Sequence, residues 1–146
     1  MNIPKHNATL EEVINFYRNS DVYRRLSSSS QKDYDNHLSA TLITEVEGKM
    51  LRAYRCKNLK VRHITQAYEK WLKVGTRTAN YRRSVLSTAW KYAMRHDVFI
   101  HNPISLVQTV TEKPRRIHWT REQVSIFLDT AYSDFRWRSI GLIVHM

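Results

Sequence analysis

The chain has 146 residues, of which 24 are Lys or Arg and 13 are Asp or Glu, so its net charge is +11 at pH 7. This length suits one ordinary domain, or one small domain with part of another, and a hydrophobic fraction of 42% excludes a disordered polypeptide. Only three Gly and three Pro are present, and strand-rich folds need many such turn residues, so the composition favours an all-α fold.

Several classes of protein are disfavoured by what the sequence lacks. The single cysteine, Cys56, cannot form an internal disulfide, which is typical of a reducing compartment. The first residues have no apolar signal-peptide core and the apolar runs are short, so we expect a cytoplasmic protein with no membrane partner. Glycine-rich phosphate loops, nucleophile elbows and paired metal-ligand motifs are missing, so we expect no metal and no cofactor.

Capping residues at their N-termini indicate the first two helices. The TLEE sequence at residues 9–12 has the pattern of a capping box and apolar residues follow at helical spacing, which predicts a helix over 9–19. A basic stretch leads to four serines at 27–30, one of which is expected to cap a second helix, in which Tyr34, Leu38 and Leu42 follow at helical spacing. Residues 44–62 have no clean period and are predicted to be a loop with a short helical piece.

Two further helices are predicted before the first proline-containing break. Thr65 is expected to cap a third helix, and Gly75 to end it. The longest helix is predicted to begin at Thr76 and to stop before His101-Asn102-Pro103, because Pro disfavours helix at the residue before it. The side chains expected to be buried in the bundle are Trp71, Leu86, Ala89, Trp90 and Ala93.

The remaining sequence predicts a division into domains. Residues 1–106 are expected to form a helical bundle of four to five helices, and residues 107–118 a polar, basic linker. In residues 119–146, a second capping box at Thr120 begins one helix and another is expected from near Asp134. The chain ends in an apolar segment without a cap, which is typical of a domain that is incomplete.

The positive charge is concentrated in one part of the sequence. Residues 61–118 hold eleven Lys or Arg and three Asp or Glu, and a local basic excess indicates a polyanionic partner such as nucleic acid. Projected at 100° per residue, the long helix has a polar face without Asp or Glu, which carries Arg77, Asn80, Ser84, Ser87, Thr88, Lys91 and Arg95. Short side chains let a helix approach a DNA backbone, and Asn can pair with adenine. Arg83 lies at the border of this face, within reach of a phosphate. An ordinary solvated helix face is the alternative.

Several segments, taken in order, resemble phage-type tyrosine recombinases. Residues 78–104, TANYRRSVLSTAWKYAMRHDVFIHNPI, are similar to the signature of the family's core-binding domain, and residues 27–38 are similar to the start of its second helix. Residues 115–131 resemble the family's linker and the first helix of its catalytic domain. The resemblance implies a helical core-binding domain and a catalytic domain that together clamp double-stranded DNA. Residues 44–62 depart from the tighter family pattern, as an insertion does.

The resemblance also implies which residues contact DNA. Matching positions are Thr78, Asn80, Arg83, Ser87 and Lys91 on the long helix, Lys32 in the second helix, and Lys113, Arg115 and Arg116 in the linker. With the polar face of the long helix, the predicted DNA-binding set is Lys32, Arg77, Thr78, Asn80, Arg83, Ser84, Ser87, Lys91, Arg95, Lys113, Arg115 and Arg116.

No catalytic residue is assigned. The family uses arginines, a lysine, a histidine and a tyrosine nucleophile, and its first catalytic arginine normally follows the helix that here reads RSIGLIVHM. No activity is therefore expected of this chain, although a longer parent would break and rejoin DNA, and self-association on DNA is expected only of that parent. The alternative function is a stand-alone helical DNA-binding regulator or a protein-interaction module.

Overall fold

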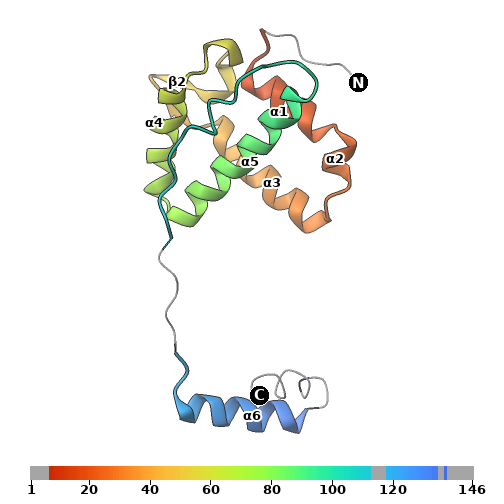
Figure 1. The fold of residues 1–146 in the computed structure, drawn as a ribbon, viewed down its shortest axis with the longest axis vertical. Helices are drawn as coiled ribbons and strands as arrows, with labels where there is room; N and C mark the ends of the chain where they lie inside the picture. The colour runs from red at the N-terminus through yellow and green to blue at the C-terminus, as the bar shows by residue number, and fades with distance from the viewer. Residues whose placement is uncertain (1–6, 113–117, 135–136, 138–146) are drawn as a thin grey trace. The chain divides into compact units, whose positions relative to one another are not determined.

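The chain forms two compact units, residues 1–112 (unit 1) and 113–146 (unit 2), in a computed structural model that describes residues 7–112, 118–134 and 137. Unit 1 is a bundle of helices with one small hairpin, which confirms the all-α expectation (Figure 1). Its elements are α1 (Leu10–Arg18), α2 (Asp21–Arg24), α3 (Ser28–Leu42), β1 (Glu45–Val46), β2 (Lys49–Met50), the 3-10 turns η1 (Leu51–Ala53) and η2 (Cys56–Asn58), α4 (Val61–Leu72) and α5 (Thr76–Met94).

The predicted capping signals set the helix starts. At α1, the Thr9 hydroxyl accepts a hydrogen bond from the Glu12 N–H at 3.3 Å, and the Glu12 carboxylate accepts one from the Thr9 N–H at 2.7 Å. At α3, the first of the four serines, Ser27, accepts from the Ser30 N–H at 3.2 Å. These side chains satisfy N–H groups that have no partner inside the helix, which is why the sequence alone located both starts.

The core of unit 1 is built around α5, which packs against α1, α3 and α4. Small residues let the helices approach closely, since Ala79, Ala89 and Ala93 are fully buried. Trp90 stacks on Phe99 with ring centroids 4.7 Å apart. Every side chain predicted to be buried is buried: Trp71, Leu86, Ala89, Trp90 and Ala93.

One short helix was not predicted, and one predicted helix start was wrong. The basic stretch after α1 contains the short helix α2, which is capped by the Ser20 hydroxyl bound to the Tyr23 N–H at 3.1 Å. Thr65 does not cap α4; the helix begins at Val61, and the Thr65 hydroxyl donates to the Val61 carbonyl at 3.1 Å inside it. A Thr inside a helix can bond back to the preceding turn, so its type alone does not mark a helix start.

Gly75 connects α4 to α5, as the sequence predicted for the end of α4. Its N–H donates to the Trp71 carbonyl at 3.2 Å, and its own carbonyl accepts from Ala79 at 3.0 Å in the first turn of α5. Its φ angle of +151° is one that side-chain-bearing residues rarely adopt. The residue therefore reverses the chain between two helices that pack against each other.

Residues 44–62, predicted to be a loop with a short helical piece, contain the β1–β2 hairpin, the 3-10 turns η1 and η2, and the start of α4. β1 and β2 pair antiparallel through a turn at Glu47 and Gly48, whose φ angles are +50° and +75°. The hairpin is attached to the core because the Tyr54 hydroxyl donates to the Val46 carbonyl at 2.6 Å and the Trp71 indole donates to Thr44 at 2.9 Å. The insertion-like segment is thus an integral part of unit 1.

After α5, Asp97 adopts a φ of +57° and the chain runs back along α5 (Figure 1). We call residues 98–110 the return segment. Trp90 donates from its indole N–H to the His101 carbonyl at 2.9 Å, and Val107 is buried. The predicted linker began at residue 107, but the packed chain extends to residue 110, because Val107 is buried and the Val110 backbone is hydrogen bonded to Asn80 and Tyr68.

Unit 2 contributes one described helix, α6 (Arg121–Ser133), which begins at the predicted capping box: Thr120 accepts from the Gln123 N–H at 3.2 Å. The Trp119 ring meets the Phe127 ring edge-on at 5.1 Å. The helix predicted from near Asp134 and the apolar end lie outside the described residues, apart from residue 137. Among the described helices, none is long and apolar enough to span a membrane.

Candidate nucleic-acid interface

One edge of the predicted DNA-binding face is occupied by the return segment. The Asn80 amide donates to the Val110 carbonyl at 2.9 Å, and the Arg83 guanidinium donates to the carbonyls of Ser105 and Val107 at 2.8 and 3.3 Å. Their role is thus internal: they satisfy backbone groups that the irregular segment leaves without partners. We call this side of α5, formed by Asn80, Arg83 and Ser87, the covered edge.

Ser87 is part of the same edge, and its predicted exposure is wrong. It is 6% exposed, and its hydroxyl accepts a hydrogen bond from the Asn102 amide at 3.0 Å. The residue was placed on the polar face by its helical angle alone, whereas the contact comes from a segment 15 residues further along the chain. A buried hydroxyl paired in this way has no surface to present to a ligand.

Both the oxygen and the nitrogen of the Asn80 side-chain amide are hydrogen bonded. The Tyr68 hydroxyl donates to the Asn80 carbonyl oxygen at 2.6 Å and accepts from the Val110 N–H at 2.9 Å. Together with the bond from the Asn80 nitrogen to Val110, this closes a small network between α4, α5 and the return segment. The edge of the amide that was expected to pair with adenine is therefore already used inside the fold.

The other edge of α5 is open. Residues spaced three and four apart form an acid-free row that we call the exposed stripe: Arg77, Tyr81, Ser84, Thr88, Lys91 and Arg95. All are exposed except Thr88, which is half-buried and donates from its hydroxyl to the Ser84 carbonyl at 3.1 Å. At a rise of 1.5 Å per residue, the stripe spans about 27 Å. It brings together four of the predicted residues, namely Arg77, Ser84, Lys91 and Arg95.

Cations lie towards both ends of the stripe, and hydroxyl-bearing side chains occupy its middle. Lys91 and Arg95 border a cavity of about 180 Å³ that is also lined by Tyr17 and Val22. Two other predicted residues lie outside the stripe: Thr78 is half-buried near the start of α5, and Lys32 is exposed in the first half of α3.

Tyr81 also lies on the stripe, although its residue type had not marked it as a candidate contact. Tyr81 is 37% exposed, and its ring lies edge-on against His37 of α3, with centroids 4.7 Å apart. Burial, with a smaller effect of the Arg82 charge, lowers the pKa of His37. Its spacing from Arg77 and Ser84 could have assigned Tyr81 to the polar face. A half-exposed aromatic ring is a suitable surface for sugar or base contacts.

Three predicted residues, Lys113, Arg115 and Arg116, lie outside the described residues. Their contribution to binding therefore stays a prediction.

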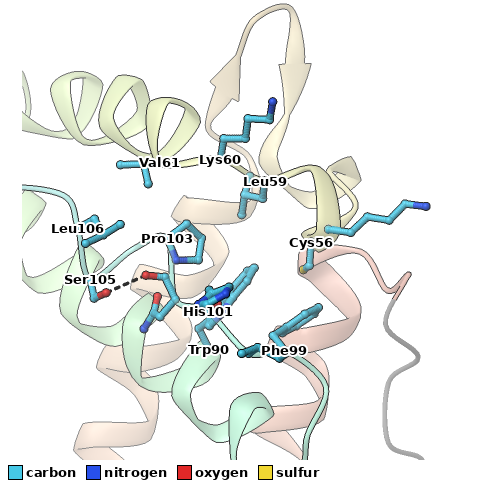
Figure 2. Close-up of a pocket in the computed structure, with 13 residues that line it drawn as sticks. Cys56, Leu59, Lys60, Val61, Trp90, Phe99, His101, Pro103, Ser105 and Leu106 are labelled. Carbon is cyan, nitrogen blue, oxygen red and sulfur yellow. Dashed lines mark hydrogen bonds between the residues drawn. The ribbon is translucent and has the colours of Figure 1, made fainter.

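An apolar cavity of unit 1 contains the single cysteine of the chain. It measures about 610 Å³ and lies between η2, the start of α4 and the return segment, with Trp90, Phe99 and Cys56 along one side (Figure 2). Burial raises the pKa of the Cys56 thiol to about 12, so it is not a thiolate at neutral pH. Among the described residues, no group of three or more His, Cys, Asp or Glu side chains is placed to hold a metal ion.

The fold is similar to that of a solved integrase. The crystal structure of a lambda integrase tetramer bound to a Holliday junction superposes with a TM-score of 0.69 over 88% of this chain, at 16% sequence identity. The chain thus shares the fold of part of that integrase. It spans 37% of the length of that integrase chain. No protein-family model and no curated protein sequence matches this chain.

Proposed function

We propose that the chain binds double-stranded DNA as the DNA-binding part of a site-specific tyrosine recombinase. The observation that carries the proposal is an acid-free stripe with cations at both ends, on a fold shared with an integrase solved on a Holliday junction. The net charge of +11 supports a polyanionic partner. The proposal assigns no catalytic residue to this chain, leaves self-association on DNA to a longer parent and places the protein in the cytoplasm.

The stripe contacts the DNA backbone in this proposal. Arg77, Lys91 and Arg95 neutralise phosphates, Ser84 lets the helix approach closely, and Lys32 adds a cation from α3. Such contacts position a protein on a duplex without reading its sequence. Because the covered edge is used internally, we expect little base discrimination from Asn80.

The proposal is tested by fluorescence anisotropy with a labelled 20-base-pair duplex between 50 and 200 mM salt. If the stripe and the linker cations form five or six phosphate contacts, log K falls with log salt at a slope of about −4.5 to −5.5. The double variant Lys91→Gln/Arg95→Gln is expected to flatten this slope by about two units on all sequences. The matched control is Arg52→Gln, an exposed cation of η1 outside the stripe.

Two results would contradict the proposal. One is binding that is indifferent to salt, and the other is a double variant whose affinity and slope equal those of Arg52→Gln. Binding that is indifferent to salt favours the protein-interaction module over the DNA-binding function, whereas a double variant equal to the control excludes the stripe as the DNA contact.

A further inference from the structure

A second basic surface of unit 1 lies apart from the stripe. The cavity between the β1–β2 hairpin and the start of α4 measures about 510 Å³. We call it the hairpin pocket; its lining is Lys49, Tyr54, Arg55, Lys57, Asn58, Lys60, Arg62 and His63. Five of these eight side chains are cationic, and none of the eight belongs to α3 or α5. The hairpin and the start of α4 lie at the opposite end of unit 1 from the start of α5 (Figure 1).

The positive charge of the pocket is poorly neutralised. Glu47 pairs with Arg62 at 3.5 Å. Its second oxygen lies 3.4 Å from His63 Nε2, and His63 Nδ1 accepts the Lys60 N–H at 3.0 Å. Over residues 7–112, no salt bridge forms to the four cations that remain, Lys49, Arg55, Lys57 and Lys60.

The backbone adds further positive potential. α4 has 12 residues and begins at the wall of the pocket, so the positive end of its dipole lies there. Its N-cap is Lys60 and its first turn contains no acidic residue, whereas α1 places Glu11 and Glu12 at the equivalent positions. A lysine at the positive end of a helix is unfavourable unless an anion is bound nearby.

We propose that the hairpin pocket binds the phosphate groups of a nucleic-acid strand, as a second contact separate from the exposed stripe. This inference rests on the proposed function, since it assumes that the partner of the chain is DNA. Arg and Lys side chains around a concavity, with a helix N-terminus beside them, present converging donors to a tetrahedral anion. The chain then holds two backbone segments, one at the exposed stripe and one at the hairpin pocket.

The test uses the whole chain and the triple variant Arg55→Gln/Lys57→Gln/Lys60→Gln. All three side chains are exposed, so the fold should be retained; the single variant Lys57→Gln provides the same test with less perturbation. Anisotropy with the 20-base-pair duplex is measured against salt. The triple variant is expected to flatten the slope by two to three units, the single variant by about one, and the control Arg52→Gln not at all.

A second arm separates a nucleic-acid strand from a small phosphate ligand. Thermal unfolding is followed with and without sodium pyrophosphate, which should raise the melting temperature of the wild type and not of the triple variant. Stabilisation by pyrophosphate without any effect of the triple variant on DNA binding overturns the nucleic-acid partner.

The outcomes also separate this inference from the proposed function. If the stripe variant weakens DNA binding and the pocket variants do not, the pocket inference fails while the proposed function stands. If neither set weakens binding, both fail.

Discussion

The two edges of α5 carry similar side chains and have different roles. Ser87 and Lys91 lie one turn apart and differ by about 40° around the helix axis, yet Ser87 is buried and Lys91 is exposed. The difference comes from the return segment, which packs on one edge and leaves the other open. The path of the chain after a helix thus decides whether its polar residues are covered inside the fold or left open to a partner.

The backbone of the return segment requires the hydrogen-bond donors of the covered edge. Residues 98–110 form no regular helix or strand, so their carbonyls and N–H groups lack the partners that secondary structure supplies. Arg83 and Asn80 provide donors to three of these carbonyls. The exposed stripe does not have this internal role, and its cations are available to a ligand.

The largest loss of stability is expected from a substitution where the return segment packs on the core. Trp90→Ala removes a buried indole, its stacking on Phe99 and its hydrogen bond to His101. We expect a loss of about 3–5 kcal/mol in the free energy of unfolding, measured by urea titration followed by far-UV circular dichroism. A loss below about 1 kcal/mol would show that the segment packs independently of the core.

The comparison of the two edges is tested most directly by one substitution made on each. Arg83→Gln removes charged donors from two carbonyls, so we expect a loss of about 1.5–3 kcal/mol in the free energy of unfolding. Arg95→Gln changes an exposed residue and should stay within about 0.5 kcal/mol. Equal losses from the two variants, in the same urea titration, would remove the distinction between the edges.

A smaller effect is expected at the network between α4, α5 and the return segment. Tyr68→Phe deletes the hydroxyl that donates to Asn80 and accepts from the Val110 N–H. The stability loss should be about 1–2 kcal/mol, with faster hydrogen exchange at the Val110 amide. If the exchange rate of that amide did not change, the end of the return segment would not depend on Tyr68.

The smallest effect concerns the ring beside the exposed stripe. Burial lowers the pKa of His37 in the folded chain below its ordinary value of 6.5, so the unfolded chain binds the proton first as the pH falls. Stability is therefore lost as the pH drops below about 6.5. The difference in melting temperature between pH 7.5 and pH 5.5 should be smaller in His37→Gln than in the wild type; an identical difference would contradict this assignment.

Local signals in the sequence predicted the frame of unit 1 because each acts within one turn of helix. The capping residues Thr9 and Ser27 bind N–H groups three residues away, and the apolar period of α5 located its core side. The hairpin was also readable, since Gly48 in a two-residue turn is a hairpin signal, but the charged residues around it concealed the pattern.

The covered edge could not be predicted in the same way. Nothing near Ser87 in the sequence indicates that Asn102 will bind it, because that contact depends on how the chain reverses at Asp97. The hairpin pocket was missed for a similar reason: its cations are spread over residues 49–62, and the fold of the segment brings them together. Contacts between distant segments depend on the tertiary structure rather than on a local period.

The packing of α1 against α5 has a consequence for how unit 1 folds. The Leu10 N–H donates to the Tyr54 carbonyl at 2.9 Å, and the buried side of α1 packs on a helix that ends at Met94. Packing α1 on α5 closes a loop that contains most of unit 1, and closing a long loop is entropically costly. Folding is therefore slower than in a bundle whose packed helices are neighbours in the sequence. During synthesis, α1 must therefore wait for most of the unit to be made, and we expect unit 1 to acquire its structure in one late, cooperative step.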